Sequence, residues 1–363
     1  MSAGHAPVPE LGPELLERHA DAHARLDAAF AEHRPAVARL TTRLALRTMV
    51  GAIANVRPTS RGGGSPALFP VPRSFLSSAE RARLAGAAAG YRYVDSRLAV
   101  VALGIDPPPA LLPETPYVLN ALTEGRMDNP DEMNPGMIRT VELPGDLPVA
   151  DYAPAARDRC RARLEEAVSV AVDPSSPAVV RAAWMLHVLG EIHPFGDGNG
   201  RVARLLYLLV AGEAMPRTVD WGVVEQLRYH QDTWSETLKE RDVTPCAVAT
   251  TELSIAGAGL TLARLGALGR VHAELGDRFE LSAEATTLVT AAWLRRWGRL
   301  DELAADVGAP YGTALGEAER LRAVGILERR HPEVESPMAL PGYAVTAAVD
   351  AAVAHVLVGE HVP

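Results

Sequence analysis

The chain has 363 residues, of which 48% are hydrophobic, and a formal net charge of −9 at pH 7. Its mean hydropathy is close to zero, as in globular proteins, and the acidic balance argues against a general binder of polyanions. Lys239 is the single lysine, which excludes a Walker-type nucleotide site because that site needs a lysine directly after its glycine-rich loop.

The cysteine content and the hydropathy of the sequence indicate the cellular compartment. Cys160 and Cys246 are isolated in the sequence, so neither a disulfide framework nor a cysteine-based metal site is expected. The sequence has no apolar run of eighteen residues, and its first segment lacks the basic and apolar stretches of a secretory signal. We therefore expect a cytoplasmic protein without a membrane partner.

Hydrophobic periodicity predicts a mainly all-α chain. Two helices are expected between residues 11 and 55, separated at Pro35, and a turn-rich loop follows at residues 57–66. Helical patterns return from residue 77 to about residue 125. Residues 129–152 are rich in turn formers, and the alternation within them predicts a short strand or β-hairpin.

Further helices are expected over residues 155–172, 179–192, 199–212, 223–241 and 246–275. From about residue 277 the pattern changes to three helices and a β-hairpin, with Gly308 at the turn between the second and third helix. This order is typical of a winged helix-turn-helix. The predicted segments are 1–60, with N-terminal helices, 61–276, with a helical core, and 277–363, with the winged helix.

The stretch HPFGDGNGRVAR, residues 193–204, lies between two strongly apolar helical patterns. Gly196, Gly198 and Gly200 let the backbone approach a ligand closely and turn several N–H groups the same way. A helix begins at about Asn199, and a helix N-terminus carries unpaired N–H groups and positive partial charge. This segment, called the motif segment below, is therefore expected to bind an anion such as a phosphate chain.

Four charged or titratable side chains complete the motif segment. Asp197 supplies the kind of oxygen ligand that Mg²⁺ accepts. Arg201 and Arg204 are three residues apart, so both guanidinium groups can face phosphates. His193 is the group in the segment that can accept a proton near neutral pH. A base, a metal ligand, an anion site and paired arginines thus fall within twelve residues, which favours a functional phosphate-binding site over a structural loop.

The motif segment matches in full the Fic family signature, HPFx(D/E)GNGRxxR, and the chain resembles this family over roughly residues 40–255. The resemblance implies a Fic-type helical bundle with a β-hairpin flap, in which 61–276 is the catalytic core. It also implies an enzyme that transfers AMP from ATP to a Ser, Thr or Tyr hydroxyl of a target protein. A C-terminal winged helix is a common companion in the family.

The resemblance also implies roles for single residues. His193 would deprotonate the target hydroxyl, and Asp197 would hold Mg²⁺ between the α- and β-phosphates of ATP. The residues implied in nucleotide binding are Phe195, Gly198, Asn199, Gly200, Arg201, Arg204 and, near the adenine, Tyr229. The flap residues implied in aligning the target as an added strand are Arg139, Thr140, Val141 and Tyr152.

Many Fic proteins restrain themselves with the motif (S/T)xxxE(G/N), whose glutamate pairs with the second motif arginine. The best local match is VGAIAN, with Val50 at the hydroxyl position, Ala54 at the glutamate position and Asn55 after it. This degenerate motif predicts an enzyme without glutamate autoinhibition. A rival match, NALTEG, retains a glutamate at Glu124 but also lacks the hydroxyl residue.

Other activities stay open. Gly200 argues against the phosphate-transferring branch of the family, which has lysine there, but transfer of UMP or phosphocholine, or action on a small molecule, remains an alternative. The predicted partners are the target protein, a second copy of the chain, and DNA through residues 277–345. Because Glu317 and Glu319 balance Arg320 and Arg322 in the candidate recognition helix, protein docking is favoured over DNA binding.

Overall fold

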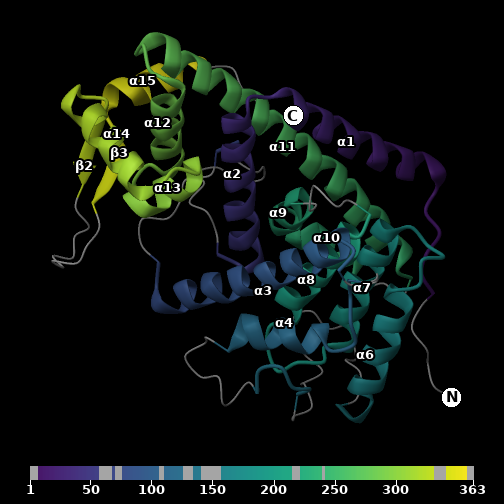
Figure 1. Ribbon diagram of the computed structural model, residues 1–363. Coiled ribbons are helices and arrows are strands. Elements are labelled where there is room, and N and C mark those ends of the chain that lie inside the picture. Colours follow the sequence, from purple (N-terminus) through teal and green to yellow (C-terminus); the bar gives the residue numbers. More distant parts are fainter. Residues whose placement is uncertain are drawn as a thin grey trace. The chain divides into compact units, whose positions relative to one another are not determined.

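The structure is a computed structural model of the chain. It describes residues 7–56, 68–69, 76–105, 110–125, 134–139, 157–214, 221–238, 242–330 and 341–357. These residues are mostly helical, as the sequence predicts, with few strands (Figure 1). The chain divides into two units. The motif unit comprises Met1–Ala24, Thr48–Arg57 and Phe75–Ala258, and the C-terminal unit comprises Arg25–Arg47, Pro58–Ser74 and Gly259–Pro363.

These units do not coincide with the predicted segments 1–60, 61–276 and 277–363. The reason is that three helices each contribute residues to both units: α1 (Pro13–Glu32), α2 (Pro35–Ile53) and α11 (Thr244–Arg278). Pro35 separates the first two helices, as predicted. The identities assigned to the three segments remain predictions.

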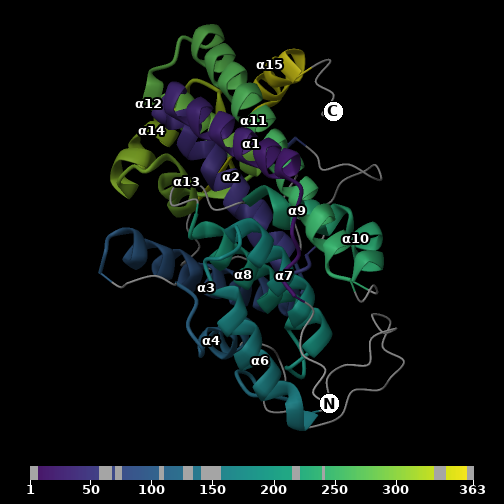
Figure 2. The same cartoon turned by 90° about the vertical axis from the view of Figure 1, so that its right-hand side faces the viewer.

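The motif unit is built around two adjacent apolar helices, α7 (Ala178–Ile192) and α8 (Asn199–Gly212), which lie side by side in both views (Figure 1 and Figure 2). Nearly every residue of α7 and α8 is buried, because both helices are apolar on most faces. The surrounding helices are α3 (Ser78–Ala102), α4 (Thr115–Glu124), α6 (Arg157–Ala171), α9 (Trp221–Tyr229) and α10 (Gln231–Thr237). Among these, α6 packs on α7, while α3 and α4 pack on α8.

Local sequence features place α3 and α4 against each other. Ser77 and Glu80 form a capping box that starts α3, each side chain bonding the other's backbone N–H. Gly86 of α3 lies directly against the backbone of Thr123 in α4, where a Cβ atom would overlap the Thr123 carbonyl. The last turn of α4 is thereby held close to the buried centre of the unit.

The C-terminal unit holds the predicted three helices and β-hairpin. The helices are α12 (Ala283–Arg295), α13 (Leu300–Val307) and α14 (Tyr311–Ala323), and Gly308 ends α13 with a left-handed φ of 69°. Strands β2 (Leu327–Arg330) and β3 (Gly342–Val345) pair antiparallel. Strand β1 (Gly298–Arg299) completes a sheet of order β1-β3-β2. Neither β1 nor the final helix α15 (Ala347–Leu357) is predicted from the sequence.

One described helix, α11, is long and apolar enough to meet the length and composition of a membrane span. Half of its most apolar window, whose mean hydropathy is 1.4, is buried inside the protein. The core helix of a globular protein passes the same test, so this helix is weak evidence for a membrane.

Candidate functional site

The histidine expected to act as a base lies where α7 stops. His193 is the C-cap of α7, with φ 48° and ψ 57°, a left-handed conformation in which histidine is enriched among non-glycine residues. The next residue, Pro194, has no N–H group with which to continue the helix. Burial lowers the pKa of His193, against the opposing effect of a backbone hydrogen bond with Gly190. At neutral pH the imidazole is therefore mostly neutral and able to accept a proton.

Arg139 holds the backbone on both sides of the bond between His193 and Pro194. Its own N–H group donates to the Pro194 carbonyl (2.8 Å), and its Nε donates to the His193 carbonyl (3.0 Å). Its Nη2 lies 3.5 Å from Sγ of Cys160 in α6, and only 2% of Arg139 is exposed. The described contacts of this predicted flap residue thus fix the loop that carries the base.

Asn199 and Phe195 shape the turn between them. Oδ1 of Asn199 accepts from the Phe195 N–H (3.0 Å), and Nδ2 donates to the Phe195 carbonyl (2.9 Å). The Phe195 side chain is fully buried and meets the ring of Tyr117 edge to face, with ring centroids 6.0 Å apart. In this conformation Phe195 and Asn199 contact each other and stabilise the loop. Any contribution that they make to nucleotide binding is therefore indirect, through the shape of the loop.

The N-terminus of α8 lies at the predicted anion site. Gly198 is its N-cap with φ 82°, a conformation that glycine adopts without strain, and Gly200 lies in its first turn. No described side chain caps this helix start. Its first N–H groups therefore remain available to an anionic ligand, and the helix dipole favours negative charge at this end.

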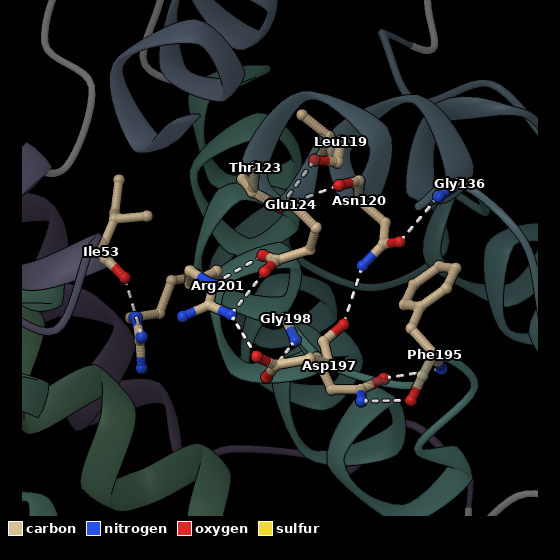
Figure 3. A network of polar contacts seen from close by, with 12 residues as sticks. Ile53, Leu119, Asn120, Thr123, Glu124, Gly136, Phe195, Asp197, Gly198 and Arg201 are labelled. Atoms are coloured by element: carbon tan, nitrogen blue, oxygen red, sulfur yellow. Dashed lines mark hydrogen bonds and ion pairs between the residues drawn. The ribbon is translucent and has the colours of Figure 1, made fainter. Parts of the chain in front are cut away.

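Arg201 is enclosed by two carboxylates (Figure 3). Its Nε and Nη2 donate to Oε1 and Oε2 of Glu124, each at 2.7 Å, and Oδ2 of Asp197 lies 3.0 Å from the same Nη2. Glu124 is buried, with a 1% exposed side chain, whereas the side chain of Asp197 is 46% exposed. Burial lowers the pKa of Arg201, but its bonds and attraction to Glu124 and then Asp197 outweigh burial and raise it.

Arg204 meets the end of α2 rather than an acid. Its Nη2 donates to the carbonyl of Ile53 at 3.1 Å, and no described acidic side chain pairs with it. Burial first, and then the positive charges of Arg201 and Arg228, lower its pKa to about 10. A buried guanidinium without a paired acid is a favourable neighbour for a phosphate group.

The predicted degenerate inhibitory residues form the C-terminus of α2. Ala54 is fully buried, and its N–H donates to the Val50 carbonyl at 2.9 Å. Asn55 has a left-handed φ of 58°, its N–H reaches Ala52, and the next N–H reaches Gly51, which is a Schellman ending. The rival Glu124 lies against the first motif arginine, not the second. The loss of glutamate autoinhibition remains a prediction.

Asn120 joins α4 to the motif segment. Its Nδ2 donates to the Asp197 carbonyl (2.9 Å), and its Oδ1 accepts from the Gly136 N–H (2.8 Å), as Figure 3 shows. Asn120 and Glu124 are four residues apart and so lie on one helix face, both toward the loop. Sequence reasoning missed Asn120 and Cys160 and considered Glu124 only as an inhibitory residue.

Of the remaining predicted site residues, the structure describes Tyr229 but not those of the flap beyond Arg139. Thr140, Val141 and Tyr152 lie outside the described residues, as does most of the predicted flap hairpin. Tyr229 is the last residue of α9 and is partly buried. Its predicted place beside the adenine, like the flap's predicted contact with the target, remains a prediction.

The arginines of α14 have partners within their own helix. Arg320 pairs with Glu317 at 2.5 Å, and Arg322 pairs with Glu319 at 2.7 Å. The Tyr343 hydroxyl of β3 also donates to Glu319. These pairs offset the positive charge with which the helix would contact DNA phosphates.

The donor set around Asp197 fits Mg²⁺. Among the described residues, no three His, Cys, Asp or Glu side chains gather as a dedicated metal cage. Mg²⁺ usually keeps waters and is held by one or two carboxylates together with substrate phosphates. The half-exposed Asp197 carboxylate beside the α8 N-terminus suits that mode of binding.

Comparison with known proteins bears on the part of the chain that holds the site. Residues 119–211 match the family model described as Fic/DOC family. A Fido domain-containing protein of Dictyostelium discoideum is 61% identical over 36 residues, which are 10% of this chain and 24% of that relative.

The chain also shows similarity to two solved structures. A Fic family protein from Desulfovibrio desulfuricans G20 has 15% identity and a TM-score of 0.49, over 94% of this chain and 99% of that one. Fic-1 of C. elegans has 20% identity and a TM-score of 0.49, over 70% and 72% of the two chains. Over residues 119–211, which carry the site, the chain is similar to the Fic/DOC family by the family model and the short curated match.

Proposed function

We propose that this protein transfers AMP from ATP to a hydroxyl side chain of a target protein in a reaction that depends on Mg²⁺. Members of the Fic/DOC family are transferases that generally move nucleotide or phosphate-containing groups to their targets. The observation that carries the proposal is a single loop in which a neutral histidine, His193, precedes the uncapped start of α8.

Each side chain has a step in the proposed reaction. The target hydroxyl oxygen forms a bond to the α-phosphorus of ATP, the bond from that phosphorus to the bridging oxygen breaks, and pyrophosphate leaves. His193 accepts the hydroxyl proton. The N–H groups that begin α8 stabilise the negative charge on the phosphates, and Arg204 adds its unpaired positive charge.

The metal would bind at Asp197. Mg²⁺, when bound, would neutralise part of the phosphate charge and orient the donor. The Asp197 carboxylate already lies next to the α8 N-terminus, because its Oδ1 accepts from the Gly198 N–H at 2.6 Å. Two restraints on this loop, from Arg139 and Asn120, keep the base and the metal ligand in one geometry.

The test is incubation of the purified chain with a cell lysate, Mg²⁺ and ATP labelled at the α-phosphate. We expect labelled protein with the wild type and none with His193→Ala or after chelation of Mg²⁺. Parallel reactions with α-labelled UTP and with CDP-choline labelled in its phosphocholine part examine the other donors. Label transferred only from UTP or only from CDP-choline would show that this compound, and not ATP, is the donor. Label that persists in His193→Ala would refute the role of His193 as the base.

We also infer that residues 277–363 are a winged helix that docks protein rather than DNA. The pairing of Arg320 and Arg322 with glutamates of α14 supports this reading. The full chain should show no salt-dependent retention on immobilised duplex DNA, and retention that Arg322→Ala abolishes would refute the inference.

A further inference from the structure

Glu124 is the most deeply buried acid at the site, and it holds the first motif arginine side-on. Both oxygens of its carboxylate bond to Arg201, through Nε and Nη2, at 2.7 Å (Figure 3). Such a bidentate, charge-assisted pair fixes the plane of the guanidinium group as well as its position. Two roles are open to Glu124: a brake that must release Arg201 before phosphate binds, or a support that stays in place while phosphate binds.

The arrangement of donors leaves one edge of Arg201 free. A guanidinium has five N–H donors in a fixed plane. Glu124 takes the Nε and one Nη2 donor, and Asp197 lies against the same Nη2. Among the described residues, Nη1 has no hydrogen bond and can still donate to a phosphate. Arg201 therefore does not need to leave Glu124 in order to bind a donor.

The burial of Glu124 also argues against its movement away from Arg201. Its side chain is 1% exposed, and Arg201 is its described ion-pair partner. Loss of that partner would leave a buried, uncompensated carboxylate, which is strongly destabilising. Gly198 packs so closely that a Cβ there would overlap the Glu124 carboxylate, and Asn120 ties the same turn of α4 to Asp197.

We propose that Glu124 is a positioning residue, which holds Arg201 side-on so that its Nη1 edge faces the phosphates of the donor. Glu124 also offsets one positive charge, so the net attraction for phosphate at this point comes from Arg204 and the α8 N-terminus. The exposed Asp197 is the carboxylate that can leave Arg201 when it binds a cation. The proposal rests on the proposed transfer of a phosphate-containing group.

The first test compares Glu124→Gln, Glu124→Ala and a matched control, Glu114→Ala, at the exposed N-cap of the same helix. Glutamine retains one acceptor oxygen, so we expect it to keep about a third of the wild-type kcat/KM, whereas alanine loses at least tenfold. The loss should appear mainly as a raised KM for ATP, and Glu114→Ala should be unchanged. A rise in activity in Glu124→Ala would establish the brake, and an unchanged activity would also overturn the proposal.

The second test does not depend on turnover. The ¹⁵Nε–¹Hε NMR signal of Arg201, assigned with Arg201→Gln, should exchange slowly with solvent because its proton is bonded to Glu124. We expect this protection to persist when α,β-methylene-ATP and Mg²⁺ bind, and to be lost in Glu124→Ala. Loss of protection on binding would overturn the proposal.

The two tests separate the proposal from the proposed function. If the analogue shifts no signal, ATP is not the donor and the proposed function fails. The role of Glu124 is then tested by repeating the same NMR experiment with inorganic pyrophosphate in place of the ATP analogue. A protected Arg201 Nε–H group with bound pyrophosphate supports the positioning role, and an unprotected one refutes it.

Discussion

Replacement of Gly198 by alanine is expected to weaken the motif unit by two separate mechanisms. The φ of 82° at this position lies in the left-handed region, which costs roughly 1–2 kcal/mol for a residue with a Cβ atom. The new Cβ would also displace the Glu124 carboxylate from Arg201. Hydrogen bonds to charged groups contribute about 1.5–3 kcal/mol, so the combined loss in the free energy of unfolding is about 2.5–5 kcal/mol.

Gly200→Ala is the matched control within the same motif. Gly200 lies in the first turn of α8 without a positive φ, and a Cβ there would be 3.6 Å from Nη1 of Arg204, an ordinary contact. Alanine in a helix is favoured over glycine by roughly 0.5–1 kcal/mol, so this variant should be neutral or slightly more stable.

Urea denaturation followed by far-UV circular dichroism measures both variants. A loss below about 1 kcal/mol in Gly198→Ala, less than the left-handed backbone alone should cost, would refute the reasoning. An equal loss in Gly200→Ala would refute it as well, since the glycines would then share some other role.

Three further predictions concern activity. Because burial lowers the pKa of His193 and the base acts in its neutral form, the acid limb of kcat/KM should have its midpoint below pH 6.5, and a midpoint above it would contradict the assignment. Arg139→Lys keeps the backbone bond to the Pro194 carbonyl but removes the Nε bond to the His193 carbonyl, so it should lower kcat at least tenfold in steady-state labelling, with little change in the far-UV spectrum. Ala54→Glu should place an acid beside Arg204 and lower labelling at least tenfold, whereas Ala54→Gln should lower it less.

The order of elements follows from local patterns, and the sequence predicts it well. Pro35 ends one helical pattern and begins another, and the apolar stretches on either side of the motif segment predict the two buried helices that hold it. Strand β1 has only two residues, too few for an alternating pattern. Helix α15 is rich in alanine and valine and follows a strand closely, so its pattern does not stand out.

The contacts that hold the loop could not be predicted in the same way. Asn120 and Glu124 reach residues 77 positions away in the chain, and Arg139 reaches one 54 positions away. Such pairs depend on how α4 packs on α8, which no local spacing determines. The motif itself predicts the chemistry because its residues are consecutive, whereas the surrounding supports come from other elements.

The two bonds of Arg139 to the carbonyls around the His193–Pro194 bond have a consequence for engineering. The backbone on either side of the histidine is held by a residue outside the twelve-residue motif, 54 positions away in the chain. A motif grafted between two apolar helices of another scaffold would carry the histidine but not this restraint on its backbone. A working transplant would need α4 and residues 134–139 as well, so the smallest portable unit of this site is a discontinuous one.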